Sequence, residues 1–219
     1  MIKLLVTSKA YCQKAIASPE AKQKDPANNY LSHMNIRRLE AEAIRDGILA
    51  ISGQASYKMY GPGVEVYFVG KTEGGGAKGP LDGDGRRSVY QRIKRNSHNP
   101  FLEAFDAPKP ATTRGDRDTT NVPAQSLTLL NDPFVIDQAS KWAKVLMADP
   151  MTSTQRIRKA FMRALTREPS EFEIQQSLNY LAELAMEYKL SPLDLPNHEK
   201  IWQDFVHSLF CLKEFIYVH

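Results

Sequence analysis

Apolar residues recur three and four positions apart through most of the chain, and this spacing predicts helices. A proline directly after a capping residue, and a Ser-x-x-Glu box, mark the beginnings of several of them. In the C-terminal half the predicted helices cover residues 123–130, 133–147, 153–165, 171–188 and 198–213. Their apolar faces include both tryptophans, Trp142 and Trp202, so we expect the two indole rings to be buried.

A further helix is predicted over residues 36–52. Asn35 is a suitable N-cap, and Gly53 stands where a left-handed residue ends a helix. Ile44 and Ile48 fall on one face at helical spacing, and this face is expected to pack against the core.

The N-terminal half also contains patterns that are not helical. Residues 2–14 begin apolar, as a helix or a strand, and residues 15–35 form a polar loop interrupted by prolines. Residues 63–69 alternate between two faces, which predicts a strand, and a second strand is expected over 87–95. The Gly-rich stretch 74–85 between them would be the long loop of a small β-hairpin. The predicted fold class is therefore α+β, predominantly α-helical, with several packed helices.

The composition is typical of a globular protein. Of 219 residues, 42% are hydrophobic and 25% are charged. No run approaches the ~20 apolar residues that a membrane-spanning helix needs, so no membrane span is expected. Lysine and arginine number 29 against 25 acidic residues, a net charge of +4, which by itself does not indicate a nucleic-acid partner.

The densest basic cluster covers residues 86–95 and includes Tyr90. Two interpretations are open. The basic side chains could neutralise phosphates while Tyr90 stacks on a base. Alternatively, they are the solvated side chains of an edge strand, where charge blocks aggregation. The second interpretation is favoured, so nucleic acid is not the partner that the sequence favours.

A group of charges lies on the side of helix 36–52 opposite its apolar face. Arg38, Glu42 and Arg45 follow one another at i, i+4 and i+7, with Asp46 beside them. Carboxylates interleaved with guanidinium groups have a lowered pKa, whereas a general acid needs a raised one. The pattern therefore favours a structural ladder of salt bridges over acid catalysis.

Recognisable catalytic and metal-binding motifs are missing from the sequence. It contains no CxxC, HxH or HxxxH pair and no GxSxG elbow, which excludes zinc-finger, thioredoxin-type and α/β-hydrolase sites. We therefore expect no metal and no cofactor. The two cysteines, Cys12 and Cys211, are either free thiols or a long-range disulfide. The first residues do not form a secretory signal, so the chain itself shows no export address and its localisation is open.

Several strings follow one another in a distinctive order: VTS (6–8), DPAN (25–28), RRLEAEAIRD (37–46), RRSVY (86–90), FLEAFD (101–106), PAQSLTLLNDPF (123–134) and LKEFIY (212–217). In this order they resemble the DUF1553 (PSD1) domain, a domain of unknown function typical of planctomycetes and related bacteria. The resemblance extends over nearly the whole chain. It implies one DUF1553-like domain over residues 1–219 that lacks the family's N-terminal helical segment.

The resemblance also implies a context. Such domains usually end large exported proteins that carry a cytochrome-c-like domain and a DUF1549 domain, so an exported or periplasmic location and these partner domains are implied. The family usually has Arg where this chain has Cys12, and Asn where it has Cys211. Because both departures are cysteines, we expect that they were replaced together and form a disulfide.

The resemblance brings no established catalytic residues. We therefore expect a non-catalytic binding or scaffolding module of an exported multidomain protein, which contacts partner domains or an extracellular polymer. One alternative is part of a polysaccharide-acting enzyme completed by a neighbouring domain, with a deep pocket lined by Arg38, Glu42, Arg92 and Gln125. The other is nucleic-acid binding through residues 86–95. The candidate binding residues are Arg38, Glu42, Arg45, Arg87, Arg92 and Gln125.

Overall fold

The computed structural model describes residues 1–66, 79–94, 98–110, 113, 115–191 and 197–218. Contacts within the chain divide it into two units. Unit 1 comprises Met1–Leu39 with Ile216–His219, and unit 2 comprises Glu40–Phe215. The assignment of residues 1–219 to one family domain stays a prediction.

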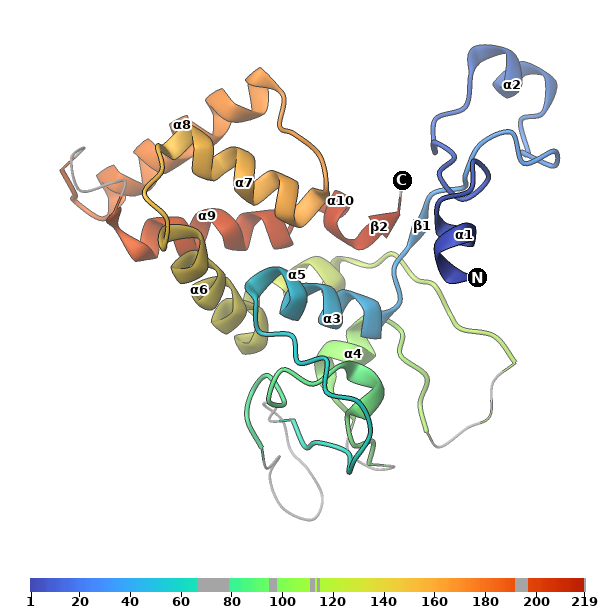
Figure 1. Cartoon of the computed structure of the whole chain (residues 1–219), viewed down its shortest axis with the longest axis horizontal. Helices are drawn as coiled ribbons and strands as arrows, with labels where there is room; N and C mark the ends of the chain where they lie inside the picture. The colour runs from blue at the N-terminus through green and yellow to red at the C-terminus, as the bar shows by residue number, and fades with distance from the viewer. Residues whose placement is uncertain (67–78, 95–97, 111–112, 114, 192–196, 219) are drawn as a thin grey trace. The chain divides into compact units, whose positions relative to one another are not determined.

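Unit 2 is built from helices (Figure 1). A short 3-10 helix, η1 (Ser88–Tyr90), lies in the chain between the first two of them. The predicted α+β, predominantly helical fold is confirmed. The α-helices are α3 (Ala41–Ser52), α4 (Pro100–Ala104), α5 (Pro123–Asn131), α6 (Pro133–Met147), α7 (Ser153–Leu165), α8 (Glu171–Glu187), α9 (Glu199–Phe210) and α10 (Lys213–Ile216), whose last residue belongs to unit 1.

Capping residues begin the long helices where the sequence predicts. The side chain of Asp132 accepts the backbone N–H of Phe134 at 2.9 Å and so caps α6. Thr152 and Ser170 form capping boxes at the starts of α7 and α8. The predicted last helix is in fact two, because α9 ends at Phe210 and α10 follows after a short turn.

The core of unit 2 lies where α6 and α9 pack together. Trp142 of α6 and Trp202 of α9 are fully buried, as predicted. The ring centroids of Trp142 and Phe210 lie 5.0 Å apart, and Phe210 is also fully buried. An aromatic pair at this separation stabilises a fold by about 0.5–1.5 kcal/mol beyond the area that it buries. Helix α3 packs on α6 and is positioned by this core.

Unit 1 contains two short helices and a small sheet. Its elements are α1 (Ile2–Val6), α2 (Pro19–Lys24), β1 (Arg37–Arg38) and β2 (Tyr217–Val218), and the two strands pair antiparallel. Neither helix buries a residue. Since α2 lies within residues 15–35, the prediction of a loop there is wrong for the six residues of this helix.

The helix predicted over residues 36–52 begins later than expected. Glu40, rather than Asn35, is its N-cap, and Arg38 lies in β1. The backbone of β1 is occupied by hydrogen bonds to β2, a distant partner that no local pattern reveals. Gly53 ends α3 in the left-handed conformation with a φ of 79°, as predicted.

The strand predicted over residues 87–95 is wrong where the structure describes it, because Ser88–Tyr90 forms η1. Val64 makes an isolated parallel bridge with Gln91, whereas a hairpin requires antiparallel pairing. Residues 67–69 of the first predicted strand and residues 74–78 of the Gly-rich loop lie outside the described part of the chain.

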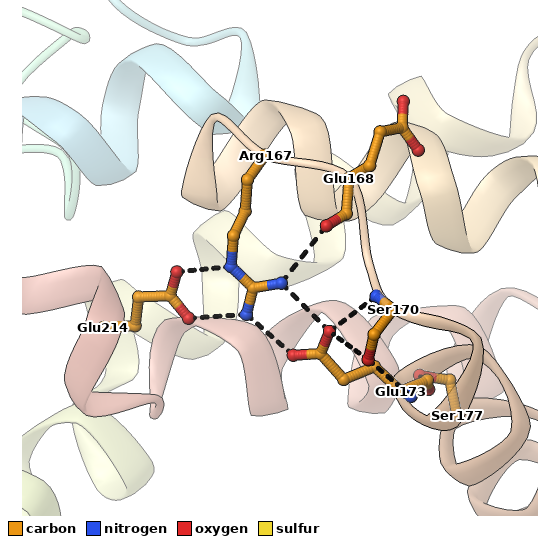
Figure 2. A network of polar contacts seen from close by, with 6 residues as sticks. All are labelled: Arg167, Glu168, Ser170, Glu173, Ser177 and Glu214. Atoms are coloured by element: carbon orange, nitrogen blue, oxygen red, sulfur yellow. Dashed lines mark hydrogen bonds and ion pairs between the residues drawn. The ribbon is translucent and has the colours of Figure 1, made fainter.

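Arg167 ties the turn between α7 and α8 to α10 (Figure 2). Its guanidinium donates to both carboxylate oxygens of Glu173, at 2.7 and 3.0 Å, and to both of Glu214, at 2.6 and 2.7 Å. Glu173 also accepts the backbone N–H and the hydroxyl of Ser170. The hydrogen bonds from Arg167, joined by those from Ser170, lower the pKa of Glu173 to about 2.

We predict that Glu173→Gln reduces the acid sensitivity of the fold. The pKa of Glu173 falls on folding from 4.5 to about 2, so its ionised form stabilises the fold above about pH 4.5. That contribution is lost as the pH falls toward about 2. Urea unfolding at neutral pH and at about pH 3 should therefore show a smaller difference in unfolding free energy for the variant than for the wild type.

Glu171→Gln is the matched control, because Glu171 lies in the same helical turn with a side chain that is 85% exposed. It should keep the acid sensitivity of the wild type. Equal acid sensitivity in the Glu173→Gln variant and the wild type would contradict the assigned role of Glu173.

Candidate functional site

A cleft of about 210 Å³ opens in unit 2 beside α4. We define it by the residues that line it. Leu102 of α4 and the prolines Pro108 and Pro110 contribute apolar wall. The charged lining residues are Glu42, Glu65, Arg92, Lys94, Glu103, Lys109 and Arg117. The cleft therefore combines apolar surface with both signs of charge.

Glu42 of α3 is held in the cleft by Arg117. The guanidinium donates two hydrogen bonds to the carboxylate, at 2.7 and 3.1 Å. Burial acts to raise the pKa of Glu42, but the hydrogen bonds and the positive charge of Arg117 outweigh it and the pKa lies below its ordinary value. The prediction of a lowered pKa at Glu42 is confirmed, although the partner is Arg117 and not Arg38 or Arg45.

Glu65 faces two cations at one end of the cleft. Its carboxylate lies 3.3 Å from the guanidinium of Arg92 and 3.5 Å from the ammonium of Lys94. One carboxylate balances only one of these charges, so this end carries an excess of positive charge. Elsewhere in the cleft Lys109 pairs with Glu103 at 3.2 Å, and their charges cancel.

Gln91 adds a polar group to the cleft wall. Its Oε1 atom is buried and accepts no hydrogen bond from the described residues. A buried acceptor without a donor destabilises a fold by about 1–3 kcal/mol.

Arg45 of α3 fixes the backbone that leads into η1. With 1% exposure, it donates to the carbonyls of Asp82 and Arg86, at 2.7 and 3.0 Å, and to the hydroxyl of Ser88 at 3.2 Å. The neighbouring Asp46 accepts the N–H and the hydroxyl of Ser88. Burial lowers the pKa of Arg45, while the carboxylates of Asp46 and Asp82 act in the opposite direction.

The structure brings only some of the predicted binding residues together. Glu42 and Arg92 both line the cleft. Arg38 belongs to unit 1, so a ladder of Arg38, Glu42 and Arg45 on one helix is wrong.

The remaining predicted binding residues have structural contacts. Arg45 is buried, and Arg87 lies 3.8 Å from the carboxylate of Asp46. Gln125 is also buried, and its amide donates to the carbonyl and the hydroxyl of Thr120, at 3.2 and 3.1 Å. A binding role for the six predicted residues stays a prediction.

Within its described residues, 86–94, the basic cluster does not present a row of free cations. Arg86 is buried, and its guanidinium lies 4.1 Å from the ring centre of Tyr90. It also donates to the carbonyl of Tyr60 at 2.9 Å, while the N–H of Tyr60 donates to the hydroxyl of Tyr90. One face of the Tyr90 ring is therefore already covered.

The two cysteines belong to different units. Cys12 is exposed, and its thiol donates to the carbonyl of Val6. Cys211 is half-buried, and burial raises the pKa of its thiol. Both are free thiols in the structure, and a disulfide between them stays a prediction.

Neither metal ligands nor membrane spans are found in the described ranges. No three His, Cys, Asp or Glu side chains there gather closely enough to hold a metal ion. No helix in those ranges combines the length and the apolar character that crossing a bilayer requires.

The six binding residues predicted from the sequence do not include Glu65, Lys109 and Arg117, which line the cleft. Arg117 stands 75 positions from Glu42, and Glu65 stands 27 positions from Arg92. No periodic signal connects residues so far apart. The mixture of arginines and aspartates around Arg117 was the only local signal of an ion pair.

We predict that Arg45→Ala lowers the free energy of unfolding by about 3 kcal/mol or more, because it leaves buried carbonyls without donors and removes a buried charge partner of Asp46. Urea unfolding measures the change. Arg87→Ala is the control: its side chain is 52% exposed and also lies near Asp46, so the loss should stay below about 1 kcal/mol. Similar losses in the two variants would contradict the assigned role of Arg45.

Comparison with known proteins places the chain in a family. The model of PSD1, described as a protein of unknown function (DUF1553), matches residues 1–181. No curated protein and no solved structure matches the chain. The matched range contains the buried Arg45 and every charged residue of the cleft. The chain belongs to the PSD1 (DUF1553) family.

Proposed function

We propose that the chain is a non-catalytic binding module of an exported multidomain protein and that its cleft holds an acidic polymer. The observation that carries the proposal is the balance of charge in the cleft. Each of its three carboxylates lies against a cation, and at Glu65 the cations outnumber the carboxylate. The DUF1549-like and cytochrome-c-like domains implied by the resemblance are the proposed neighbours of the module.

The state of Glu42 supports a binding role over proton transfer. A general acid must hold a proton near the working pH, which requires a raised pKa. The pKa of Glu42 is lowered, and both of its carboxylate oxygens accept hydrogen bonds from Arg117. This carboxylate positions Arg117 and stays ionised.

The excess positive charge supports an acidic ligand. The side chains of Arg92 and Lys94 are 64% and 44% exposed, so both remain accessible to an anion. The apolar wall at Leu102 and Pro108 suits the C–H face of a ring or chain. A chain of uronic acid sugars fits both the excess positive charge and the apolar wall.

The two alternatives receive less support. A polysaccharide-acting enzyme was expected to gather four residues in one pocket, and of these Glu42 and Arg92 line the cleft while Gln125 is held by Thr120. For nucleic-acid binding, Tyr90 was expected to be available to stack on a base, and Arg86 covers one face of its ring.

The test is titration of the full chain with a galacturonate oligosaccharide of about six sugars by isothermal calorimetry. We expect binding that weakens with salt, as contacts between exposed charges do. In the double variant Arg92→Gln/Lys94→Gln, the Kd should rise about tenfold or more. Lys58→Gln/Lys189→Gln removes two exposed lysines outside the cleft and should leave the Kd unchanged.

Three results would count against the proposal. The first is no binding by the wild type, and the second is equal binding by the Arg92→Gln/Lys94→Gln variant. The third is the release of new reducing ends from the oligosaccharide, which would favour the enzyme. Stronger binding to duplex DNA than to the oligosaccharide, lost in the same variant, would favour a nucleic-acid partner.

A further inference from the structure

The net positive charge of the protein is concentrated in residues 1–39, which belong to unit 1. Residues 1–39 contain seven lysines and arginines and two acids, a net charge of +5. Residues 40–219 contain 22 basic and 23 acidic residues, a net charge of −1. The overall charge of +4 therefore hides a strong asymmetry, which points to a partner for this segment.

Both acids of this segment are already engaged. Glu20 pairs with Lys24 at 2.7 Å. The carboxylate of Asp25 accepts the backbone N–H groups of Asn29 and Tyr30, at 2.9 and 2.8 Å. The exposed lysines without an acidic partner among the described residues are Lys3, Lys9, Lys14 and Lys22.

The same segment also contains exposed apolar side chains. Ile2, Leu5 and Val6 lie at i, i+3 and i+4 on one face of α1 and are 78%, 58% and 40% exposed. Tyr11, which follows α1, is 65% exposed. Single exposed apolar residues are common, but a helical face of them indicates a contact surface.

Hydrogen bonds hold this surface in a defined shape. The N–H of Cys12 donates to the carbonyl of Ser8 at 3.0 Å. The side chain of Gln13 donates to the carbonyl of Leu31 at 2.9 Å, and the N–H of Met34 donates to the carbonyl of Lys14 at 3.0 Å. The chain after α1 is thus tied to the loop around Leu31, whose side chain is 67% exposed.

We propose that this surface, formed by Ile2, Leu5, Val6 and Tyr11 with the lysines around them, docks an acidic amphipathic helix of a partner protein. Apolar residues of such a helix would pack against the exposed face of α1, and its glutamates would meet Lys3, Lys9 and Lys14. The surface belongs to unit 1 and the cleft to unit 2, so this inference does not depend on the proposed ligand of the cleft.

The combination of lysines and exposed apolar side chains in unit 1 favours an acidic amphipathic helix over other partners. A nucleic acid or an acidic sugar chain would use the lysines but would leave Ile2, Leu5 and Val6 in water. A neutral apolar helix would cover these three side chains but would leave the lysines unpaired. An acidic amphipathic helix satisfies both, since helices dock through apolar residues three and four positions apart.

The test uses the full chain and a synthetic peptide of about 18 residues, long enough to form a helix. Leucines stand three and four positions apart in it, and glutamate and alanine fill the other positions. Fluorescence anisotropy should show binding that weakens with salt. Ile2→Ser/Leu5→Ser should raise the Kd about tenfold. Lys3→Glu/Lys9→Glu should raise it by at least as much, because it reverses two charges.

Matched controls separate this surface from the rest of the chain. Phe172→Ser/Met186→Ser removes two apolar side chains of α8 that are 73% and 77% exposed, and it should leave the Kd unchanged. A peptide of the same composition in scrambled order should bind at least tenfold more weakly, by about 1.4 kcal/mol. The substituted residues Ile2, Lys3, Leu5 and Lys9 are all exposed, so the variants should fold, and an unchanged midpoint of urea unfolding checks this.

The proposal is overturned if the wild type does not bind the peptide or if the scrambled peptide binds equally well. It is also overturned if the Ile2→Ser/Leu5→Ser and Lys3→Glu/Lys9→Glu variants bind the peptide like the wild type. Binding of the full chain is also measured to vesicles of phosphatidylcholine and phosphatidylglycerol and to duplex DNA. If the chain binds the vesicles or the DNA more tightly than the peptide, and the same two variants lose this binding, the proposal is also overturned.

Discussion

The arrangement of unit 2 around the cleft depends on one buried guanidinium. Arg45 projects from α3 and donates to carbonyl groups of the segment that leads into η1. Burying this charge costs hydration, so it is stable only because the backbone acceptors and the carboxylates of Asp46 and Asp82 surround it. The segment adopts the shape that these donors require, and that shape brings Gln91 and Arg92 to the cleft.

Pairing of charges over long distances in the sequence explains the character of the cleft. Glu42 is satisfied by Arg117, and Glu103 by Lys109, so these groups contribute position and little net charge. At Glu65 two cations share one carboxylate, and the remaining charge is available to a ligand. Unit 1 shows the same principle in a stronger form, because both of its acids are engaged locally while four of its five lysines have no acidic partner among the described residues.

Local signals predicted the elements that depend on local physics. The caps at Asp132, Thr152 and Ser170 use side chains within three residues of the N–H groups that they accept, so the sequence shows them directly. The burial of Trp142 and Trp202 followed from helical spacing. The strand expected over 87–95 is wrong at Ser88–Tyr90, where the chain forms the 3-10 helix η1 and Ser88 is held by Asp46 of α3, a contact that no local pattern reveals.

The sequence by itself determined that the protein is mainly helical, where α6, α7 and α8 begin, and that its N-terminal segment is strongly basic. These properties depend on residue type and on spacing of a few positions. Only the tertiary structure decided that Arg45 is buried, that Arg38 lies in a strand, and that Glu42 meets Arg117. The physical reason is that a charged side chain is stable in any place that supplies counter-charges and hydrogen bonds, and chain folding alone brings such partners together from distant positions.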